Sequence, residues 1–104
     1  MAGKPVQVVW TKRSQKQMKS AFDYIYNDSP QNAAKVLEDI ALTVNKTISN
    51  PEIYSLDKYK IKNDGTYRAF EKHHYRVSYR YTDNVIRVLS KAYKHEAFDV
   101  LMIL

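Results

Sequence analysis

Ten lysines and arginines lie between residues 58 and 94, and they are the residues of this chain best suited to chemistry. Only three acidic residues accompany them, so this segment has a net charge of +7, while the whole 104-residue chain has +6. Arginine holds phosphate or carboxylate oxygens in a planar fork, and lysine stabilises negative charge at one point. A concentrated basic surface attracts phosphate backbones, acidic protein segments or anionic lipids. The alternative is a solvated face without a partner.

Alternating residue types indicate how these cations are positioned. Successive side chains of a strand point to opposite faces of its sheet. One face of the segment 75–81 therefore has Tyr75, Val77, Tyr79 and Tyr81, and the other has Arg76, Ser78 and Arg80. The segment 85–93 repeats the division, with Ile86, Val88 and Ala92 opposite Arg87, Leu89 and Lys91. With a turn at Thr82, Asp83 and Asn84, the pattern predicts a meander over residues 66–93 that has one packed and one cationic face.

Two helices are predicted before the meander. After a short apolar strand at residues 6–10, Thr11 can cap a first helix, and Ser29 with Pro30 can begin a second that Asn50 and Pro51 end. The first helix has an apolar stripe of Met18, Ala21, Phe22 and Ile25. The second has a stripe of Ala33, Val36, Leu37, Ile40, Ala41, Val44 and Ile48. Because the connection is short, the helices form an antiparallel hairpin whose apolar stripes match the packed face of the sheet.

These elements predict one α+β domain over residues 1–104, with an N-terminal strand, a two-helix antiparallel hairpin and a three-stranded antiparallel meander that forms a small curved sheet. The chain has no cysteine, which fits a reducing cytoplasm. No segment is long and apolar enough for a membrane span, and the N-terminus has no features of a signal peptide. We expect a soluble cytoplasmic protein.

Three segments leave alternatives open. Residues 52–65 form either a short strand or a mobile basic loop. Lysines alternate with Tyr59 and Ile61 at residues 58–62, as in a strand, but a turn signal at residues 63–65 interrupts this alternation. The apolar run 100–104 is a packed tail, a self-association patch or a partner-binding strand. His73 and His74 are adjacent and have no carboxylate or cysteine at ligand spacing, which favours a hairpin turn over a metal site. We predict no metal and no cofactor.

The order of elements, together with Asn50-Pro51, Tyr67-Arg68 and Tyr75-Arg76-Val77-x-Tyr79, resembles the RelE/ParE superfamily of toxins from bacterial type II toxin-antitoxin modules. The resemblance extends from Val8 to about Phe98. It implies one of two activities. RelE-like members are ribosome-dependent endoribonucleases that cut mRNA through attack of the RNA 2′-hydroxyl on the adjacent phosphate, without a metal. ParE-like members inhibit DNA gyrase by binding it.

The resemblance also implies roles for particular residues. Under the nuclease interpretation, Arg76 matches the family's phosphate-binding arginine on the open face, and Arg68 on the same face falls where relatives have a catalytic lysine. Lys94 or His95 would take part in charge stabilisation or proton transfer. The substrate would be bound by Arg80, Arg87, Lys91 and Tyr93.

Two of these assignments have an alternative, and one position departs from the family's pattern. Arg68 could instead form a salt bridge with Glu71 or with an acid of the loop, and Tyr93 could be a packing residue. Phe70 stands where the nucleases often have a second lysine, which departs from their pattern.

Three hypotheses follow, in the order in which the sequence favours them. The first is a RelE-like endoribonuclease toxin, and the second is a ParE-like toxin that binds gyrase, where the same arginines would meet the antitoxin or the target. The third is a basic interaction domain without toxicity. The expected partners are a cognate antitoxin with an apolar, acidic segment, and either the ribosome with its mRNA or DNA gyrase.

Overall fold

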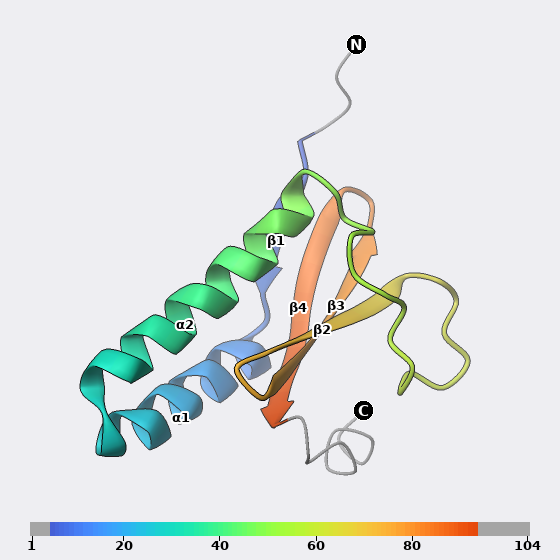
Figure 1. Ribbon diagram of the computed structural model, residues 1–104. Coiled ribbons are helices and arrows are strands. Elements are labelled where there is room, and N and C mark those ends of the chain that lie inside the picture. Colours follow the sequence, from blue (N-terminus) through green and yellow to red (C-terminus); the bar gives the residue numbers. More distant parts are fainter. Residues whose placement is uncertain (1–4, 94–104) are drawn as a thin grey trace.

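The computed structural model describes residues 5–93, with side chains as far as Leu89, and has the predicted α+β architecture (Figure 1). The elements in chain order are β1 (Gln7–Trp10), α1 (Lys12–Asp28), α2 (Pro30–Asn45), a 3₁₀ turn (Lys46–Ile48), β2 (Tyr67–Lys72), β3 (Tyr75–Thr82) and β4 (Val85–Tyr93). The helical hairpin, the meander and the strand before them are thus confirmed. The second helix ends at Asn45, a few residues before the predicted stop at Pro51.

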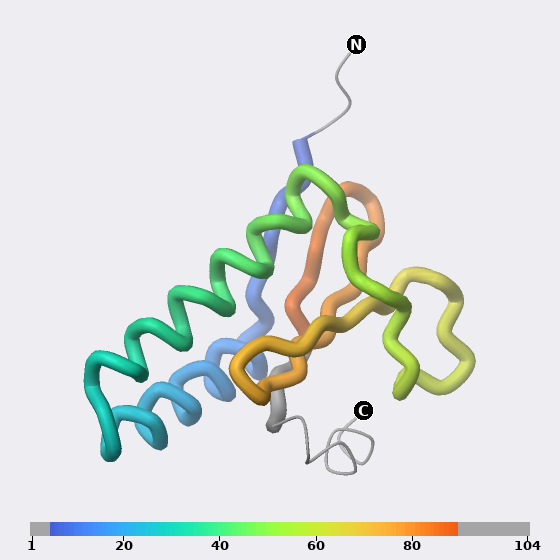
Figure 2. The backbone as a smooth tube through the Cα atoms, in the orientation of Figure 1, coloured from blue at the N-terminus to red at the C-terminus, as the bar shows by residue number. Residues whose placement is uncertain are grey.

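The four strands form one sheet in the order β1-β4-β3-β2. The three C-terminal strands pair antiparallel, as the meander predicted, while β1 pairs parallel to β4 with Gln7 opposite Val85. The helical hairpin makes the connection between β1 and the meander, and the tube view shows it lying along one side of the sheet (Figure 2). The opposite side of the sheet therefore has no helix over it among the described residues.

Local chemistry explains where the helices begin. The Thr11 hydroxyl accepts a hydrogen bond from the Ser14 N–H at 3.1 Å and donates one to the Val88 carbonyl at 2.9 Å. It thus caps α1 and ties the helix to β4. Ser29 caps α2 by accepting from the Asn32 N–H at 3.2 Å, and Pro30 supplies the first helical residue.

Two tight turns connect the strands of the meander. Asp83 and Asn84 have positive φ angles of 53° and 61°, as the predicted hairpin turn requires. His73 and His74 form the other turn at 53° and 67°, and the His73 Nε2 lies 2.6 Å from an Asp39 carboxylate oxygen. The hydrogen bond from His73 holds the pKa of Asp39 below its ordinary value of 3.8. No cluster of three potential metal-binding side chains occurs among the described residues.

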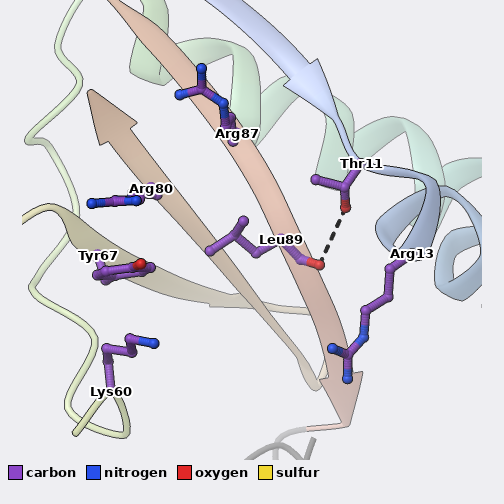
Figure 3. Close-up of a pocket in the computed structure, with 7 residues that line it drawn as sticks. All are labelled: Thr11, Arg13, Lys60, Tyr67, Arg80, Arg87 and Leu89. Atoms are coloured by element: carbon purple, nitrogen blue, oxygen red, sulfur yellow. Dashed lines mark hydrogen bonds between the residues drawn. The ribbon is translucent and has the colours of Figure 1, made fainter. Parts of the chain in front are cut away.

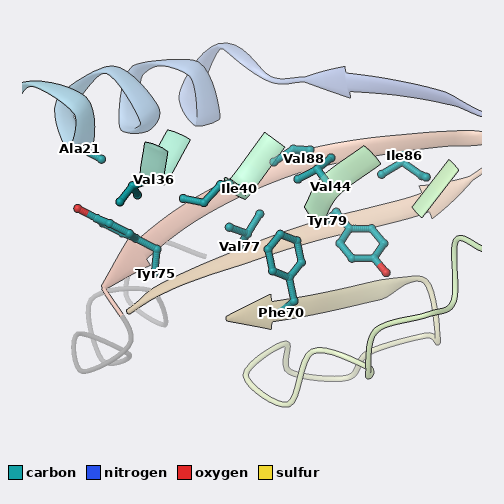
Figure 4. Close-up of a cluster of buried hydrophobic side chains, with 10 residues drawn as sticks. All are labelled: Ala21, Val36, Ile40, Val44, Phe70, Tyr75, Val77, Tyr79, Ile86 and Val88. Carbon is teal, nitrogen blue, oxygen red and sulfur yellow. The ribbon is translucent and has the colours of Figure 1, made fainter. Parts of the chain in front are cut away.

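The core lies between the sheet and the helices (Figure 4). It consists of Ala21, Val36, Ile40, Val44, Phe70, Tyr75, Val77, Tyr79, Ile86 and Val88. The alternation in β3 predicted this face correctly for Tyr75, Val77 and Tyr79, while Tyr81 is only partly buried. Burial of this apolar surface is the main force that holds the helical hairpin on the sheet. In the part of the chain that the structure describes, no helix has the length and apolar character of a membrane span.

The segment between the 3₁₀ turn and β2 is an irregular loop that wraps around the edge of the sheet. Tyr54 packs on the core side, with its ring 4.8 Å from that of Phe70. The chain then runs along β2, where the Asp57 N–H donates to the Tyr67 carbonyl at 2.9 Å and Leu56 forms an isolated bridge with Arg68. The loop continues onto the face opposite the helices and covers the β2 edge, which would otherwise expose unpaired backbone groups.

Tyr79 makes the stability of the fold sensitive to alkaline pH. Burial raises the pKa of its phenol from 10.0 to about 12, and the hydroxyl donates to the Pro51 carbonyl at 2.9 Å. The folded state therefore favours the neutral phenol, so this stabilisation is complete below pH 10 and is lost as the pH rises toward about 12. Urea titrations at about pH 9 and about pH 11 measure how much stability is lost between these two pH values. This loss should be smaller for Tyr79→Phe than for the unchanged protein.

The matched control for this experiment is Tyr26→Phe, because the Tyr26 side chain is 50% exposed. That variant should keep the full alkaline loss. An equal alkaline loss in Tyr79→Phe and in the unchanged protein would show that burial of the Tyr79 phenol does not cause the sensitivity.

Candidate functional site

Arg76 lies on the face opposite the helices, but it is not open to solvent. Its exposure is only 7%, and its Nη2 lies 2.7 Å from a carboxylate oxygen of Asp57, itself 3% exposed. Its guanidinium also lies 4.5 Å from the centre of the Tyr59 ring, and a Glu71 oxygen is 3.8 Å from its Nη1. The predicted open position of Arg76 is therefore wrong, because the loop after the 3₁₀ turn folds over this part of the sheet.

Arg68 lies on the other side of the sheet. The register of β2 and β3 pairs it with Tyr79, a core residue, so its side chain shares the face that the helices cover. There its Nη1 donates to the Tyr54 carbonyl at 2.7 Å and its Nη2 lies 3.7 Å from Glu52. The prediction that Arg68 and Arg76 share one face is wrong, and the alternative of a salt bridge to an acid of the loop is confirmed.

A cationic hollow of about 430 Å³ lies on the face opposite the helices. It is lined by Thr11, Arg13, Lys60, Tyr67, Arg80, Arg87 and Leu89 (Figure 3). Of the eight predicted site residues, Arg80 and Arg87 line this hollow, while Arg68 and Arg76 do not. Figure 3 shows Leu89 near the middle, with basic side chains from β3, β4, α1 and the loop around it.

Tyr67 organises one wall of the hollow. The Lys60 ammonium lies 4.5 Å and the Arg80 guanidinium 4.8 Å from the centre of its ring, on opposite sides in Figure 3. Both distances are within the range of cation–π attraction. Arg80 also donates through Nε to the Thr66 hydroxyl at 3.1 Å. These contacts fix the direction of the Arg80 guanidinium.

One acid partly offsets the positive charge of the hollow. Asp64 lies 3.6 Å from the Arg80 Nη2, and hydrogen bonds from Thr66 hold the pKa of this carboxyl below its ordinary value. Asp64 is therefore ionised at neutral pH. On β4, Arg87 donates to the Thr82 hydroxyl at 3.0 Å. Among the described residues, the hollow thus has four basic lining residues, and the Asp64 carboxylate is paired with one of them.

The remaining predicted site residues lie at or beyond the end of the described chain. The β4 backbone pairs Lys91 with Val77 and Tyr93 with Tyr75, but their side chains lie outside the described part. Lys94 and His95 lie outside the described residues altogether.

The other five lining residues of the hollow were not predicted as site residues: Thr11, Arg13, Lys60, Tyr67 and Leu89. The alternation of lysine and tyrosine at residues 58–60 was the only signal for the loop's contribution. Nothing in the sequence indicated that Arg13 at the start of α1 would lie beside β4.

Comparisons with known proteins agree with this fold. The family model for the ParE toxin of the type II toxin-antitoxin system parDE matches residues 8–92. A solved structure of a chromosomal ParDE system from P. aeruginosa has a TM-score of 0.67 at 16% identity, covering 85% of this chain and 95% of that one. No curated protein sequence matches the chain.

Two other solved toxins are similar in fold. A mutant of the E. coli toxin RelE in the free state has a TM-score of 0.62 at 16% identity, covering 97% of this chain and all of that one. A YoeB dimer from Staphylococcus aureus has a TM-score of 0.58 at 20% identity, covering 86% and 98%. The match of the family model spans most of the 104 residues, so this chain belongs to the ParE family of type II toxins, within the RelE/ParE superfamily.

Proposed function

We propose that this toxin arrests growth by binding, as a ParE-like inhibitor of DNA gyrase, and that a cognate antitoxin neutralises it. The observation that supports binding over RNA cleavage is the burial of Arg76 against Asp57, with 2.7 Å between the charged groups. An arginine that stabilises the transition state of phosphate cleavage must meet the phosphate oxygens directly. Here the Arg76 guanidinium already forms an ion pair with the Asp57 carboxylate of the protein itself.

The other residues of the nuclease pattern also favour binding. Arg68 contacts the Tyr54 carbonyl and Glu52 on the helix side of the sheet, and Phe70 is part of the core. At the two β2 positions where the nuclease resemblance implied lysines, Arg68 is therefore engaged by contacts within the protein and Phe70 carries no charge. A binding function needs only a shaped, charged surface, which the cationic hollow provides.

The RelE-like endoribonuclease remains the second candidate, and the cationic hollow itself favours it. Arg80 and Arg87 lie on an open positive surface that attracts phosphates, and both are predicted substrate-binding residues. Lys94 and His95 follow directly after β4 in the sequence and keep their predicted roles under this candidate.

The antitoxin partner is proposed from the family and from the solved relatives. These relatives include a chromosomal ParDE system from P. aeruginosa and the RelBE2 toxin-antitoxin complex from Mycobacterium tuberculosis. A basic toxin with a chain charge of +6 suits an acidic antitoxin segment. Co-expression of the two partners should give a complex with 1:1 or higher stoichiometry that remains intact during size-exclusion chromatography at moderate salt.

Purified gyrase provides the test of the gyrase proposal. Incubation of the chain with gyrase, ATP and supercoiled plasmid should convert plasmid to the linear form after detergent and protease treatment, because a gyrase poison traps the cleaved complex. The double variant Arg80→Gln with Arg87→Gln should need roughly tenfold more protein for the same effect, since two charged contacts are lost.

The matched control removes the same charge elsewhere. Lys19→Gln with Lys35→Gln changes two exposed lysines on the helices, whose side chains are 78% and 69% exposed. This variant should act like the unchanged protein. No plasmid cleavage at any toxin concentration, with toxicity retained in cells, would exclude gyrase as the target.

A further inference from the structure

We propose that the cationic hollow binds an acidic peptide segment of a partner protein, with one apolar side chain of that segment seated on Leu89. This inference rests on the proposed function, a toxin that acts by binding, and names the chemistry of what the hollow accepts. Carboxylates of the segment would meet the surrounding guanidinium and ammonium groups.

A β-bulge gives the hollow its apolar floor. The register of β3 and β4 pairs Tyr79 with Val88 and Ser78 with Ser90, so Leu89 has no partner on β3. Bulges of this kind redirect a side chain and interrupt the regular pairing. The Leu89 side chain lies near the centre of the hollow and is partly exposed (Figure 3). An apolar residue at this place favours a ligand that brings an apolar group.

The basic residues around Leu89 come from four different parts of the chain. Arg13 belongs to α1, Lys60 to the loop, Arg80 to β3 and Arg87 to β4. The Arg80 side chain is 39% exposed although it stacks on Tyr67 and lies near Asp64. An oriented and accessible guanidinium suits the planar carboxylate of aspartate or glutamate. The ring of charge around an apolar floor therefore matches an acidic segment with an apolar centre.

The aromatic rings on this face argue against single-stranded nucleic acid as the ligand. Sequence-tolerant binding of single strands depends on bases that stack on aromatic side chains. Tyr67 has Lys60 and Arg80 on opposite sides of its ring, and Tyr59 has Arg76 at 4.5 Å and Lys58 at 5.3 Å. Both rings are thus engaged by the protein's own cations. A base would have to displace a cation before it could stack.

Three probes distinguish the ligand classes. The first is a fluorescent nonapeptide with four glutamates on each side of one leucine, the second has serine in place of that leucine, and the third is a nine-nucleotide oligouridine. Their affinities for the full-length chain are measured by fluorescence anisotropy. We expect the leucine peptide to bind about tenfold more tightly than the serine peptide, because it buries an apolar side chain on Leu89.

Variants identify the site of binding. Leu89→Ser should remove the difference between the two peptides, and Arg80→Gln with Arg87→Gln should weaken both peptides several-fold. Leu42→Ser, which changes a 55% exposed leucine on α2, is the matched control and should leave all affinities unchanged. Thermal melting of each variant shows whether it is folded.

Two results would overturn the inference. One is equal affinity, or no binding, for the two peptides, and the other is tighter binding of the oligouridine than of the leucine peptide. These outcomes are separate from failure of the gyrase proposal. If the leucine peptide binds preferentially but the chain has no effect on gyrase, the hollow is a peptide-binding site and gyrase is not the target.

Discussion

Replacing Arg76 with alanine should lower the free energy of unfolding by about 3 to 5 kcal/mol, because Asp57 would remain as a buried charge without its partner. Both side chains are almost fully buried, at 8% and 2% exposure, and their charged groups are 2.7 Å apart. A domain of this size has a total stability of roughly 5 to 15 kcal/mol, so the change would remove a large share of it and lower the denaturation midpoint clearly. Chemical denaturation followed by circular dichroism measures the change.

A double replacement separates charge burial from packing. Arg76→Met together with Asp57→Leu removes both charges and should recover at least half of the stability that Arg76→Met alone loses. Arg87→Met is the matched control on the same face. Because Arg87 is only partly buried, this replacement should lower the free energy of unfolding by less than about 1 kcal/mol. If Arg76→Ala were as stable as the unchanged protein, Arg76 would not hold the loop on the sheet. Loss of toxicity in Arg76→Ala would not by itself indicate catalysis.

Truncation of Ile40 to alanine should produce the second large loss of stability. Ile40 is fully buried at 0% exposure on the face of α2 that meets β3 and β4. Its replacement by alanine leaves a cavity between the helical hairpin and the sheet, and such changes cost about 2 to 5 kcal/mol. Urea denaturation of Ile40→Ala should therefore show a much lower midpoint with an unchanged slope.

Leu42 on the same helix provides the comparison. Its side chain is 55% exposed, so Leu42→Ala should change stability by no more than about 0.5 kcal/mol. Similar losses for the two variants would mean that α2 packs on the sheet through a different face from the one described.

The sequence predicted most features that depend on neighbouring residues. Thr11 and Ser29 begin the helices, and Asp83 with Asn84 forms the turn of the last hairpin, because their side chains or backbone angles act locally. The alternation in β3 also placed Val77 in the core. These signals depend on chain geometry over a few residues, so they need no knowledge of tertiary contacts.

The candidate site was less predictable because it depends on contacts between distant segments. The burial of Arg76 requires Asp57, which lies 19 residues earlier in a loop without periodicity. The side of Arg68 depends on the register between β2 and β3, and β2 has the apolar residues Ala69 and Phe70 on opposite faces. The bulge at Leu89 cannot be seen in an alternating pattern. Residue types therefore predicted a cationic face with Arg80 and Arg87 on it, but they did not predict the burial of Arg76 or the side of Arg68.

The central proposal is that this toxin acts by binding and does not cut RNA. The most direct test maps the 5′ ends of translated messages and the gyrase-linked DNA breaks. Both are mapped in the first minutes after tightly controlled expression of the toxin begins. The account predicts DNA breaks at gyrase sites and the same 5′ ends of mRNA as before induction. New 5′ ends within codons that depend on translation, without DNA breaks, would contradict it and make the endoribonuclease the correct function.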